Sequence, residues 1–172
     1  GIVKKLVYQF KYKPFVSSLR NILVDLMYEG LIQKEQFIKT IESREARHRL
    51  APGEARSGFA RQSKNKLVLV PIPLYKSKLK RRGYNQAQLL SLGLSKKFNI
   101  PMIEMLIRVK NTRSQVGLER KKRKENISGA FSVNFNIPTF ARQSRASAGE
   151  ANIFLVDDVL TTGSTLLEAA NV

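Results

Sequence analysis

The spacing of hydrophobic residues divides the chain into a helical N-terminal segment, a polar stretch, and a region in which strands and helices alternate. Ile2, Leu6 and Phe10 recur at helical intervals, Pro14 interrupts the pattern, and apolar positions resume it from Leu19 to Met27. These intervals predict two amphipathic helices within residues 1–33. We expect residues 1–38 to form an N-terminal helical segment that covers one face of a sheet, as a cover or hood.

The next segment, residues 39–66, is polar and poor in aliphatic side chains. Pro52, Gly53 and Gly58 interrupt it, and the sequences FARQS and GEA each occur twice, at 59–63 and 140–144 and at 53–55 and 149–151. A stacking repeat protein would need more copies and an apolar period. The pattern therefore indicates a low-complexity surface insert, to which we assign no function.

Residues 67–172 carry the pattern of a domain core. Apolar or alternating stretches predict strands at 67–70, 102–107, 129–135 and 153–156. Residues 85–98 predict a helix with Asn85 as its N-cap, and another helix begins at Thr165. The many charged side chains of residues 109–126 predict a long loop between the strands at 102–107 and 129–135. The alternation predicts an α/β fold with a mainly parallel sheet, whose ligands lie at the carboxyl ends of the strands.

Charge is distributed unevenly along the chain. Lys and Arg number 31 against 13 Asp and Glu, which gives a net charge of +18. Residues 64–124 contain 17 basic and two acidic residues, a local net charge of +15, whereas residues 146–172 contain four acids and no base. This excess predicts a polyanionic partner, either a nucleic acid or a phosphorylated small molecule.

Composition excludes several classes of site. The chain has no cysteine, so it has no disulfide, no thiolate zinc site and no cysteine nucleophile. Its single histidine, His48, argues against a histidine-built metal site and against a Ser-His-Asp triad. The longest apolar run, residues 67–74, is far too short to span a membrane, and no signal peptide is visible. We therefore expect a cytoplasmic protein without a membrane partner.

The stretch IFLVDDVLTTGST, residues 153–165, carries the clearest chemistry. It predicts a buried strand that ends in Asp157 and Asp158, followed by a hydroxyl-rich turn and the N-terminus of a helix. Backbone N–H groups at such a terminus bind phosphate, and a glycine there lets the backbone approach closely. The two carboxylates suit ribose hydroxyls, Mg²⁺, or both. These features together describe a site for a ribose 5-phosphate, and its turn residues are Thr161, Thr162, Gly163, Ser164 and Thr165.

Two basic runs leave alternatives open. We expect the run from Lys76 to Arg82 to be a loop in which the lysines are solvated and Arg81 and Arg82, nearest the next helix, contact ligand. We expect much of the run from Arg120 to Lys124 to be solvated. Clusters of this kind also bind nucleic-acid phosphates, but aromatic residues are not interleaved with them as a stacking surface for single strands requires.

The residues now support a resemblance. The stretch IFLVDDVLTTGST resembles the phosphoribosyl pyrophosphate (PRPP) signature of type I phosphoribosyltransferases. VPIPLYKSKLKRRGYNQAQLL, at 70–90, and the motif Gly129-Ala130-Phe131 are similar to one branch, the ComF-type (competence-associated) phosphoribosyltransferases. The same branch is matched by the spacing of Arg108, Thr112, Gln115, Leu118, Arg123 and Asn126. The similarity covers residues 67–172.

The resemblance implies a type I phosphoribosyltransferase-like fold with specific roles for these residues. Asp157 and Asp158 would contact the ribose hydroxyls, with Mg²⁺ bridging ribose and pyrophosphate, and residues 161–165 would hold the 5-phosphate. A loop at 109–126 would close over the site, with Arg123 as a catalytic residue. A core of this type continues into a further strand, so we expect residues 67–172 to be incomplete at the C-terminus. The pyrophosphate would meet Arg81, Arg82, Gly83 and Tyr84, and the closing loop would contribute Thr112, Gln115, Arg123 and Asn126.

Two functions follow as hypotheses. In the first, the protein binds PRPP with Mg²⁺, transfers the phosphoribosyl group to a nucleophile that the sequence does not identify, and releases pyrophosphate. In the second, a non-catalytic module of the same fold acts in DNA uptake by binding nucleic acid. A PRPP-sensing regulator is a third, weaker hypothesis. The oligomeric state is not indicated by the sequence.

Overall fold

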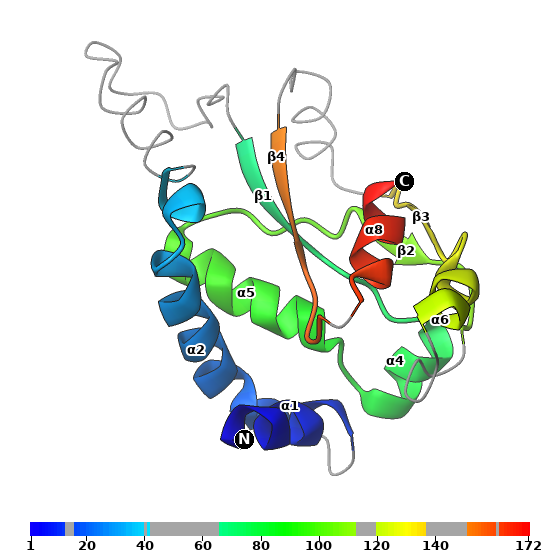
Figure 1. Cartoon of the computed structure of the whole chain (residues 1–172), viewed down its shortest axis with the longest axis horizontal. Coiled ribbons are helices and arrows are strands. Elements are labelled where there is room, and N and C mark those ends of the chain that lie inside the picture. Colours follow the sequence, from blue (N-terminus) through cyan, green and yellow to red (C-terminus); the bar gives the residue numbers. More distant parts are fainter. Residues whose placement is uncertain (13–15, 40, 42–65, 113–119, 137–150, 161) are drawn as a thin grey trace.

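The computed structural model of the 172-residue chain describes residues 1–12, 16–39, 41, 66–112, 120–136, 151–160 and 162–172. Two long strands run side by side through the middle of the molecule, with helices on both sides (Figure 1). The fold is therefore α/β, as the sequence predicts. The predicted insert at 39–66 lies almost wholly outside the described residues, as does the second copy of its repeated words.

The central strands form a small parallel sheet. β1 (Lys66–Pro71) pairs with β4 (Ala151–Val156) in a register that places Lys66 opposite Ala151 and Pro71 opposite Val156. On the other edge of β1, the Leu69 N–H donates to Pro101 O at 2.9 Å and Leu69 O accepts from the Ile103 N–H at 2.9 Å. The strands predicted at 67–70 and 153–156 are confirmed, and their parallel pairing explains why both are almost wholly aliphatic.

The prediction of one strand over 102–107 is wrong. Only the residues around Met102 pair with β1, and the chain then turns, with the Met105 N–H donating to Ile103 O at 3.0 Å. β2 (Leu106–Arg108) follows and pairs antiparallel with β3 (Phe131–Val133), in the stretch predicted as a strand over 129–135. An apolar run shows that a segment is buried, but it does not show where the backbone turns.

One face of the parallel sheet is covered by the helices predicted from residues 1–33 and 85–98. These are α1 (Ile2–Lys11), α2 (Arg20–Ile32), which follows the short 3₁₀ helix η1 (Ser17–Leu19), and α5 (Gln86–Phe98). The Asn85 side chain caps α5 by accepting from the Ala87 N–H at 3.2 Å. A Cβ at Gly93 would lie 2.4 Å from Val24 Cγ2, so this glycine allows α2 and α5 to pack closely. The buried core here contains Phe10, Leu23, Val24, Leu67, Leu69, Leu90, Leu94, Ile100 and Val156.

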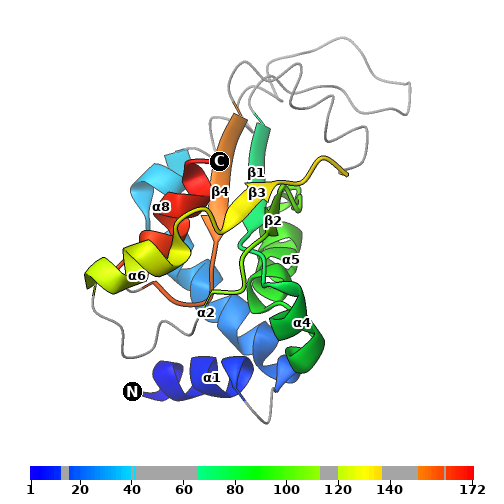
Figure 2. The ribbon, with the colours of Figure 1, turned by 90° about the vertical axis from the view of Figure 1, so that its right-hand side faces the viewer.

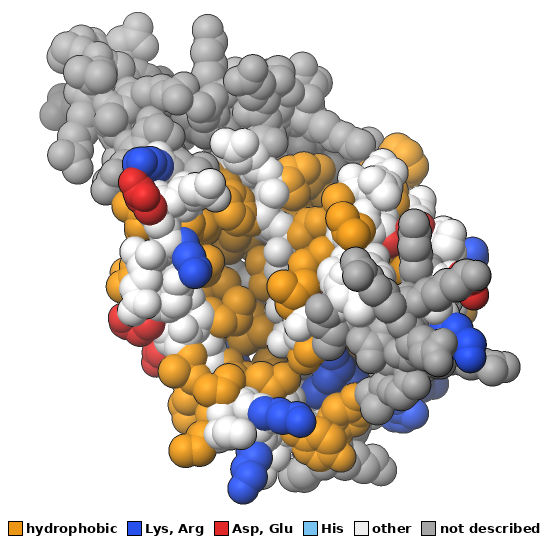
Figure 3. All heavy atoms as spheres, in the orientation of Figure 1, with side chains coloured by type: hydrophobic (Ala, Val, Ile, Leu, Met, Phe, Trp, Pro, Cys, Tyr) orange, Lys and Arg blue, Asp and Glu red, His pale blue; other side chains and the backbone are white. Residues whose placement is uncertain are grey.

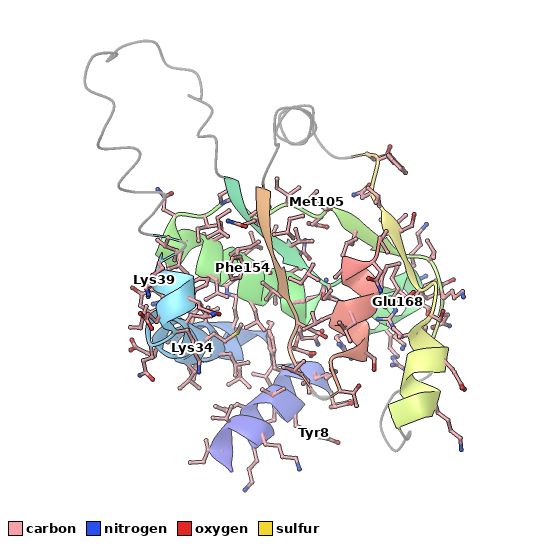
Figure 4. All side chains as sticks on the ribbon, turned by 45° about the horizontal axis from the view of Figure 1, so that its top comes forward. Tyr8, Lys34, Lys39, Met105, Phe154 and Glu168 are labelled. Atoms are coloured by element: carbon pink, nitrogen blue, oxygen red, sulfur yellow. The ribbon has the colours of Figure 1, made fainter. Side chains whose placement is uncertain are left out.

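The opposite face carries α8 (Ser164–Ala170), α6 (Arg120–Ile127) and the β2–β3 pair. A second cluster, which includes Val70, Ile127, Phe131 and Ala169, is buried between them. The Glu168 carboxylate accepts from the Gly129 N–H at 2.6 Å, and Figure 4 shows Glu168 on the side of α8 that faces β3 and α6. This contact ties the helix after the motif to the β2–β3 side of the molecule.

Two segments predicted as loops are helices. α4 (Lys76–Arg82) ends at Gly83, whose φ of 85° closes the helix in the left-handed conformation, and α6 begins at Arg120. Lysine and arginine are good helix formers, so a run of cations is compatible with a helix as well as with a solvated loop. None of the helices in the described ranges is long and apolar enough to cross a membrane.

Candidate functional site

Several of the described residues that the sequence singles out lie at one end of the sheet. The carboxyl ends of β1 and β4 lie together because the strands are parallel and in register from Lys66 to Pro71. α1 and α4 lie beyond this end, below the strands in Figures 1 and 2. In an open α/β sheet this is where ligands bind.

The first part of the site, here called the acidic half, consists of Asp157, Asp158 and residues 162–165. The Asp157 carboxylate accepts a hydrogen bond from the Asp158 N–H at 2.8 Å. Burial, and then the neighbouring charge of Asp158, raise the pKa of Asp157 to about 6, from an ordinary value of 3.8. The charged form of Asp157 is therefore disfavoured in the protein alone, and a ligand that donates hydrogen bonds or positive charge to it would stabilise that form.

The turn after Asp158 is shaped by a single glycine and two hydroxyls. Gly163 has a φ of 72°, and its carbonyl accepts from the Leu167 N–H at 2.9 Å, which begins α8. The Thr162 and Ser164 hydroxyl oxygens are 2.8 Å apart. A small hollow is lined by Asp157 together with the turn: Val159, Leu160, Thr162, Gly163, Ser164, Thr165 and Leu166. Thr161 lies outside the described residues.

Asp158 has different surroundings from Asp157. It is not among the residues that line the hollow, and its Oδ1 is 2.8 Å from the Lys11 Nζ of α1. The Asp158 side chain is only 7% exposed, and that of Lys11 is 28% exposed. The two adjacent carboxylates, which the sequence predicts as one unit, are thus divided between the turn and the N-terminal helix.

The second part of the site, here called the basic half, consists of Lys78, Arg82 and Arg108. Thr112, 6% exposed, connects two of them: its carbonyl oxygen accepts from Lys78 Nζ at 2.7 Å, and its hydroxyl accepts from the Arg108 guanidinium. The prediction that Lys78 is solvated is therefore wrong, whereas Lys76 and Lys80 are exposed as predicted. Figure 3 shows Lys and Arg side chains gathered toward the lower end of the molecule.

The charges of the two halves act on each other. Burial lowers the pKa of Lys78, and the charges of Arg108, Arg81, Arg82 and Lys11 lower it further. Burial also lowers the pKa of Arg82 and of Arg108; Asp158 opposes this shift at Arg82, and Asp157 opposes it at Arg108. Three cations, Lys78, Arg82 and Arg108, therefore lie close together, and Arg82 and Arg108 each lie close to a carboxylate. The charged form of each cation is less favourable here than in water.

The Arg108 guanidinium has a buried N–H group that is available to bind an anion. Its Nε is buried, and among the described residues it has no hydrogen-bond partner. A buried guanidinium N–H without a partner is costly, and an anion with several oxygens would satisfy it. The surroundings of Arg108 therefore favour an anionic group of a ligand at this position.

Other predicted contacts have structural partners. Arg82 donates to the Gln86 side chain, the Tyr84 hydroxyl donates to Phe10 O at 2.8 Å, and Gly83 ends α4. Arg81 is exposed at the end of the same helix. Three residues of the predicted closing loop are described. Thr112 lies between Lys78 and Arg108, and Asn126 and Arg123 belong to α6. The Arg123 side chain is not among the described parts of the chain. Gln115 and Leu118 lie outside the described residues.

Sequence reasoning missed two cations of the site, Lys78 and Lys11, whereas it did single out Arg82. Lys78 and Arg82 are four residues apart and share a helix face, so a helix prediction over 76–82 would have paired them. Lys11 gives no such signal, because it is one of many lysines and reaches Asp158 across 147 residues of sequence. Long-range contacts of this kind are absent from local patterns.

The carboxylates fit Mg²⁺ only together with a ligand. Among the described residues, no three His, Cys, Asp or Glu side chains are grouped as a protein-only metal site would need. Mg²⁺ is commonly held by one or two carboxylates and by the phosphates of a substrate. Asp157 lines the hollow and Asp158 follows it in the chain, so these two side chains would be the ones to supply hard oxygen ligands to Mg²⁺.

Comparisons with known proteins address the family. Competence protein F of Haemophilus influenzae is 43% identical over 102 residues, which are 59% of this chain and 41% of that protein. Competence protein ComFC of Bacillus subtilis is 37% identical over 103 residues, 60% of this chain and 36% of that protein. DNA utilization protein YhgH of Escherichia coli is 34% identical over 103 residues, 59% of this chain and 40% of that protein.

The chain is related to the ComF-type proteins. The resemblance predicted from its motifs is confirmed by these matches. The matched residues span about two fifths of the length of these ComF-type relatives. No protein-family model matches the chain, and no solved structure matches it significantly.

Proposed function

We propose that this ComF-type protein is a phosphoribosyltransferase that binds PRPP with Mg²⁺ and transfers its phosphoribosyl group to a nucleophile. The observation that carries the proposal is the placement of Asp157 and a hydroxyl-rich turn around one hollow, next to a cluster of partly buried cations. A sugar that carries both a phosphate and a pyrophosphate has anionic groups on two sides of its hydroxyls. The acidic and basic halves are complementary to that distribution.

In the proposed complex, the turn at 162–165 holds the 5-phosphate with backbone N–H groups and hydroxyls. Asp157 accepts hydrogen bonds from ribose hydroxyls, and its carboxylate lies near the positive charge that develops on the sugar. The basic half binds the pyrophosphate and stabilises the negative charge that it gains. A type I phosphoribosyltransferase-like fold is part of the proposal, and the small parallel sheet of β1 and β4 is compatible with it.

The proposed reaction is a substitution at the anomeric carbon. The bond from that carbon to the pyrophosphate oxygen breaks, and pyrophosphate leaves with the electron pair. The acceptor nucleophile forms the new bond to the same carbon and releases its proton to solvent. A bound Mg²⁺ supplies additional positive charge beside the leaving group. The chemistry needs neither cysteine nor histidine as a nucleophile or base, which suits this composition.

A binding experiment tests the proposal. PRPP is titrated into the protein by calorimetry in the presence of Mg²⁺, and the double variant Asp157→Asn/Asp158→Asn is compared with it. We expect the variant to lose at least about 100-fold in affinity, because it lacks two charge-assisted contacts of roughly 1.5–3 kcal/mol each. Asp25→Asn is the matched control, since Asp25 is an exposed carboxylate on α2 that pairs with Lys97.

Equal affinity of the protein and the double variant for PRPP would refute the assignment of this site. A second assay measures pyrophosphate release over a panel of nucleobases and amines. Release with one acceptor identifies the nucleophile. PRPP binding without release on any acceptor supports the sensing function instead of the transferase.

A second candidate function is nucleic-acid binding in DNA uptake. It is favoured by the net charge of +15 over residues 64–124 and by relatives named for competence and DNA utilization. These names also support a role in competence for either function. A steep fall of oligonucleotide affinity with salt, unaffected by PRPP, would favour this alternative. Oligonucleotide affinity that PRPP lowers would show that both ligands share the basic half.

A further inference from the structure

The N-terminal helix is attached to the site by its last turn. Phe10 is fully buried, and its carbonyl oxygen accepts two hydrogen bonds, from the Tyr84 hydroxyl at 2.8 Å and from Gln86 Nε2 at 2.9 Å. The Phe10 and Tyr84 rings are also in contact, with centroids 5.6 Å apart. Carbonyls in the last turn of a helix lack partners within the helix, so these donors fix the end of α1 to the segment beside the basic half.

This attachment places Lys11 against Asp158. The distance from Lys11 Nζ to Asp158 Oδ1 is 2.8 Å, and the Asp158 side chain is 7% exposed. An ion pair with one largely buried partner is more costly to break than a surface pair, because it leaves a charge without compensation. One oxygen of a predicted sugar-binding carboxylate is therefore already taken by a cation of the protein itself.

The rest of α1 makes fewer contacts with the protein. Its first turns are solvent-exposed, with Ile2, Val3 and Tyr8 at 77%, 54% and 60% exposure. Only Leu6, Val7 and Phe10 of this helix pack into the hydrophobic cluster on that face of the sheet. The polar contacts at its C-terminal end therefore add to the packing of these three side chains.

We propose that Lys11 is a positioning residue that exchanges with ligand at Asp158, so that docking of α1 and binding of a sugar phosphate with its divalent cation oppose each other. The inference rests on the proposed function. When ribose hydroxyls or a divalent cation take the Asp158 carboxylate, the Lys11 ammonium leaves it, and α1 loses one of its few polar anchors. By linkage, the factor by which ligand weakens docking equals the factor by which docking weakens ligand binding.

The first experiment needs no ligand. Hydrogen exchange of α1 is measured in the full chain and in the variants Lys11→Met and Asp158→Asn. We expect each variant to raise the exchange of α1 amides several-fold while exchange of α5 is unchanged. Lys11→Arg, which keeps a cation beside Asp158, should protect α1 as the unaltered protein does. Lys5→Met is the matched control, because Lys5 is exposed on the same helix. Unchanged exchange in Lys11→Met overturns the proposal, whatever the protein binds.

The second experiment uses ribose 5-phosphate with Mg²⁺ as the probe. We expect Lys11→Met to bind it about 5- to 10-fold more tightly than the unaltered protein, and the probe to raise exchange of α1 in the unaltered protein only. Equal or weaker binding by Lys11→Met overturns the exchange of partners while leaving the proposed function intact. A third outcome is that neither protein binds ribose 5-phosphate, although Lys11→Met still raises hydrogen exchange of α1. That outcome contradicts both the proposed function and the exchange of partners at Asp158.

Discussion

The acidic and basic halves of the site are built in opposite ways. The acidic half comes from one continuous stretch, in which a strand, two carboxylates and a glycine turn follow one another over 153–165. The basic half is assembled from α4 and from the end of β2, and Thr112 joins Lys78 to Arg108. A contiguous motif fixes its own geometry, whereas a dispersed cluster depends on the packing of the whole domain.

The same contrast appears in the charges. Asp157 is a partly buried acid with a neighbouring acid, so its charged form is disfavoured unless a ligand compensates it. In the basic half, partial burial and then the neighbouring cations lower the pKa of Lys78, so its charged form is also disfavoured. A ligand with hydroxyls or a cation at one end and phosphates at the other would relieve both halves at once. Four predictions test the contrast: two changes in affinity, the larger first, and then two changes in stability, the larger first.

The larger of the two changes in affinity is expected in the basic half, from Arg108→Gln. We expect a loss of about 10- to 100-fold in affinity for PRPP or pyrophosphate, because a buried guanidinium makes charge-assisted hydrogen bonds of roughly 1.5–3 kcal/mol. Calorimetric titration of pyrophosphate measures it. Lys80→Gln removes an exposed cation of α4 and serves as the control. If both variants bind pyrophosphate as the unaltered protein does, the basic half is not an anion site.

The next effect is a pH dependence specific to the acidic half. With the pKa of Asp157 raised to about 6, ligands that need its charge should bind about tenfold more weakly at pH 5 than well above pH 6. Asp158, Lys11 and Arg108 are the charged groups that act on it. A titration series from pH 5 to 8 with ribose 5-phosphate and Mg²⁺ tests this, and a flat profile contradicts it.

Stability should change with pH in the opposite direction. The folded pKa of Asp157 lies above its unfolded value of 3.8, so the folded state holds this proton more tightly. Its contribution to the free energy of unfolding is full below pH 3.8 and is lost as the pH rises through about 6, by at most about 3 kcal/mol. Urea unfolding at pH 4.5 and 7 measures it. In Asp157→Asn this part of the slope should disappear, and an unchanged slope would assign it to other groups.

The smaller of the two changes in stability is expected in the turn, from Gly163→Ala. The φ of 72° is unfavourable for a residue with a Cβ, by about 1–2 kcal/mol, whereas a Cβ would meet only an ordinary contact, with Leu160 Cδ1 at 3.9 Å. We expect a loss of about that size in the free energy of unfolding, together with weaker binding of inorganic phosphate. Gly30→Ala, in α2 with open space around it, is the control and should be neutral or stabilising. Equal stability of the two variants would show that the turn tolerates a side chain.

Much of the fold could be predicted from local patterns. The helix at 86–98 with its Asn85 cap and the strands at 66–71 and 151–156 follow from signals within each segment. The predictions that failed concern 102–107, 76–82 and 120–126. An apolar run is the same whether the strand continues or turns after Ile103, and a cationic run forms a helix or a loop according to what packs against it.

By itself, the sequence determined the acidic half, because its residues are neighbours along the chain and a strand, a glycine and a helix start fix their order in space. Only the tertiary structure decided which carboxylate faces the hollow, which lysine of α4 is partly buried, and that Lys11 pairs with Asp158. Those outcomes depend on the docking of α1 and α4 against the strand ends. Burial and the balance of charges there belong to the packed molecule and are not encoded in any single segment.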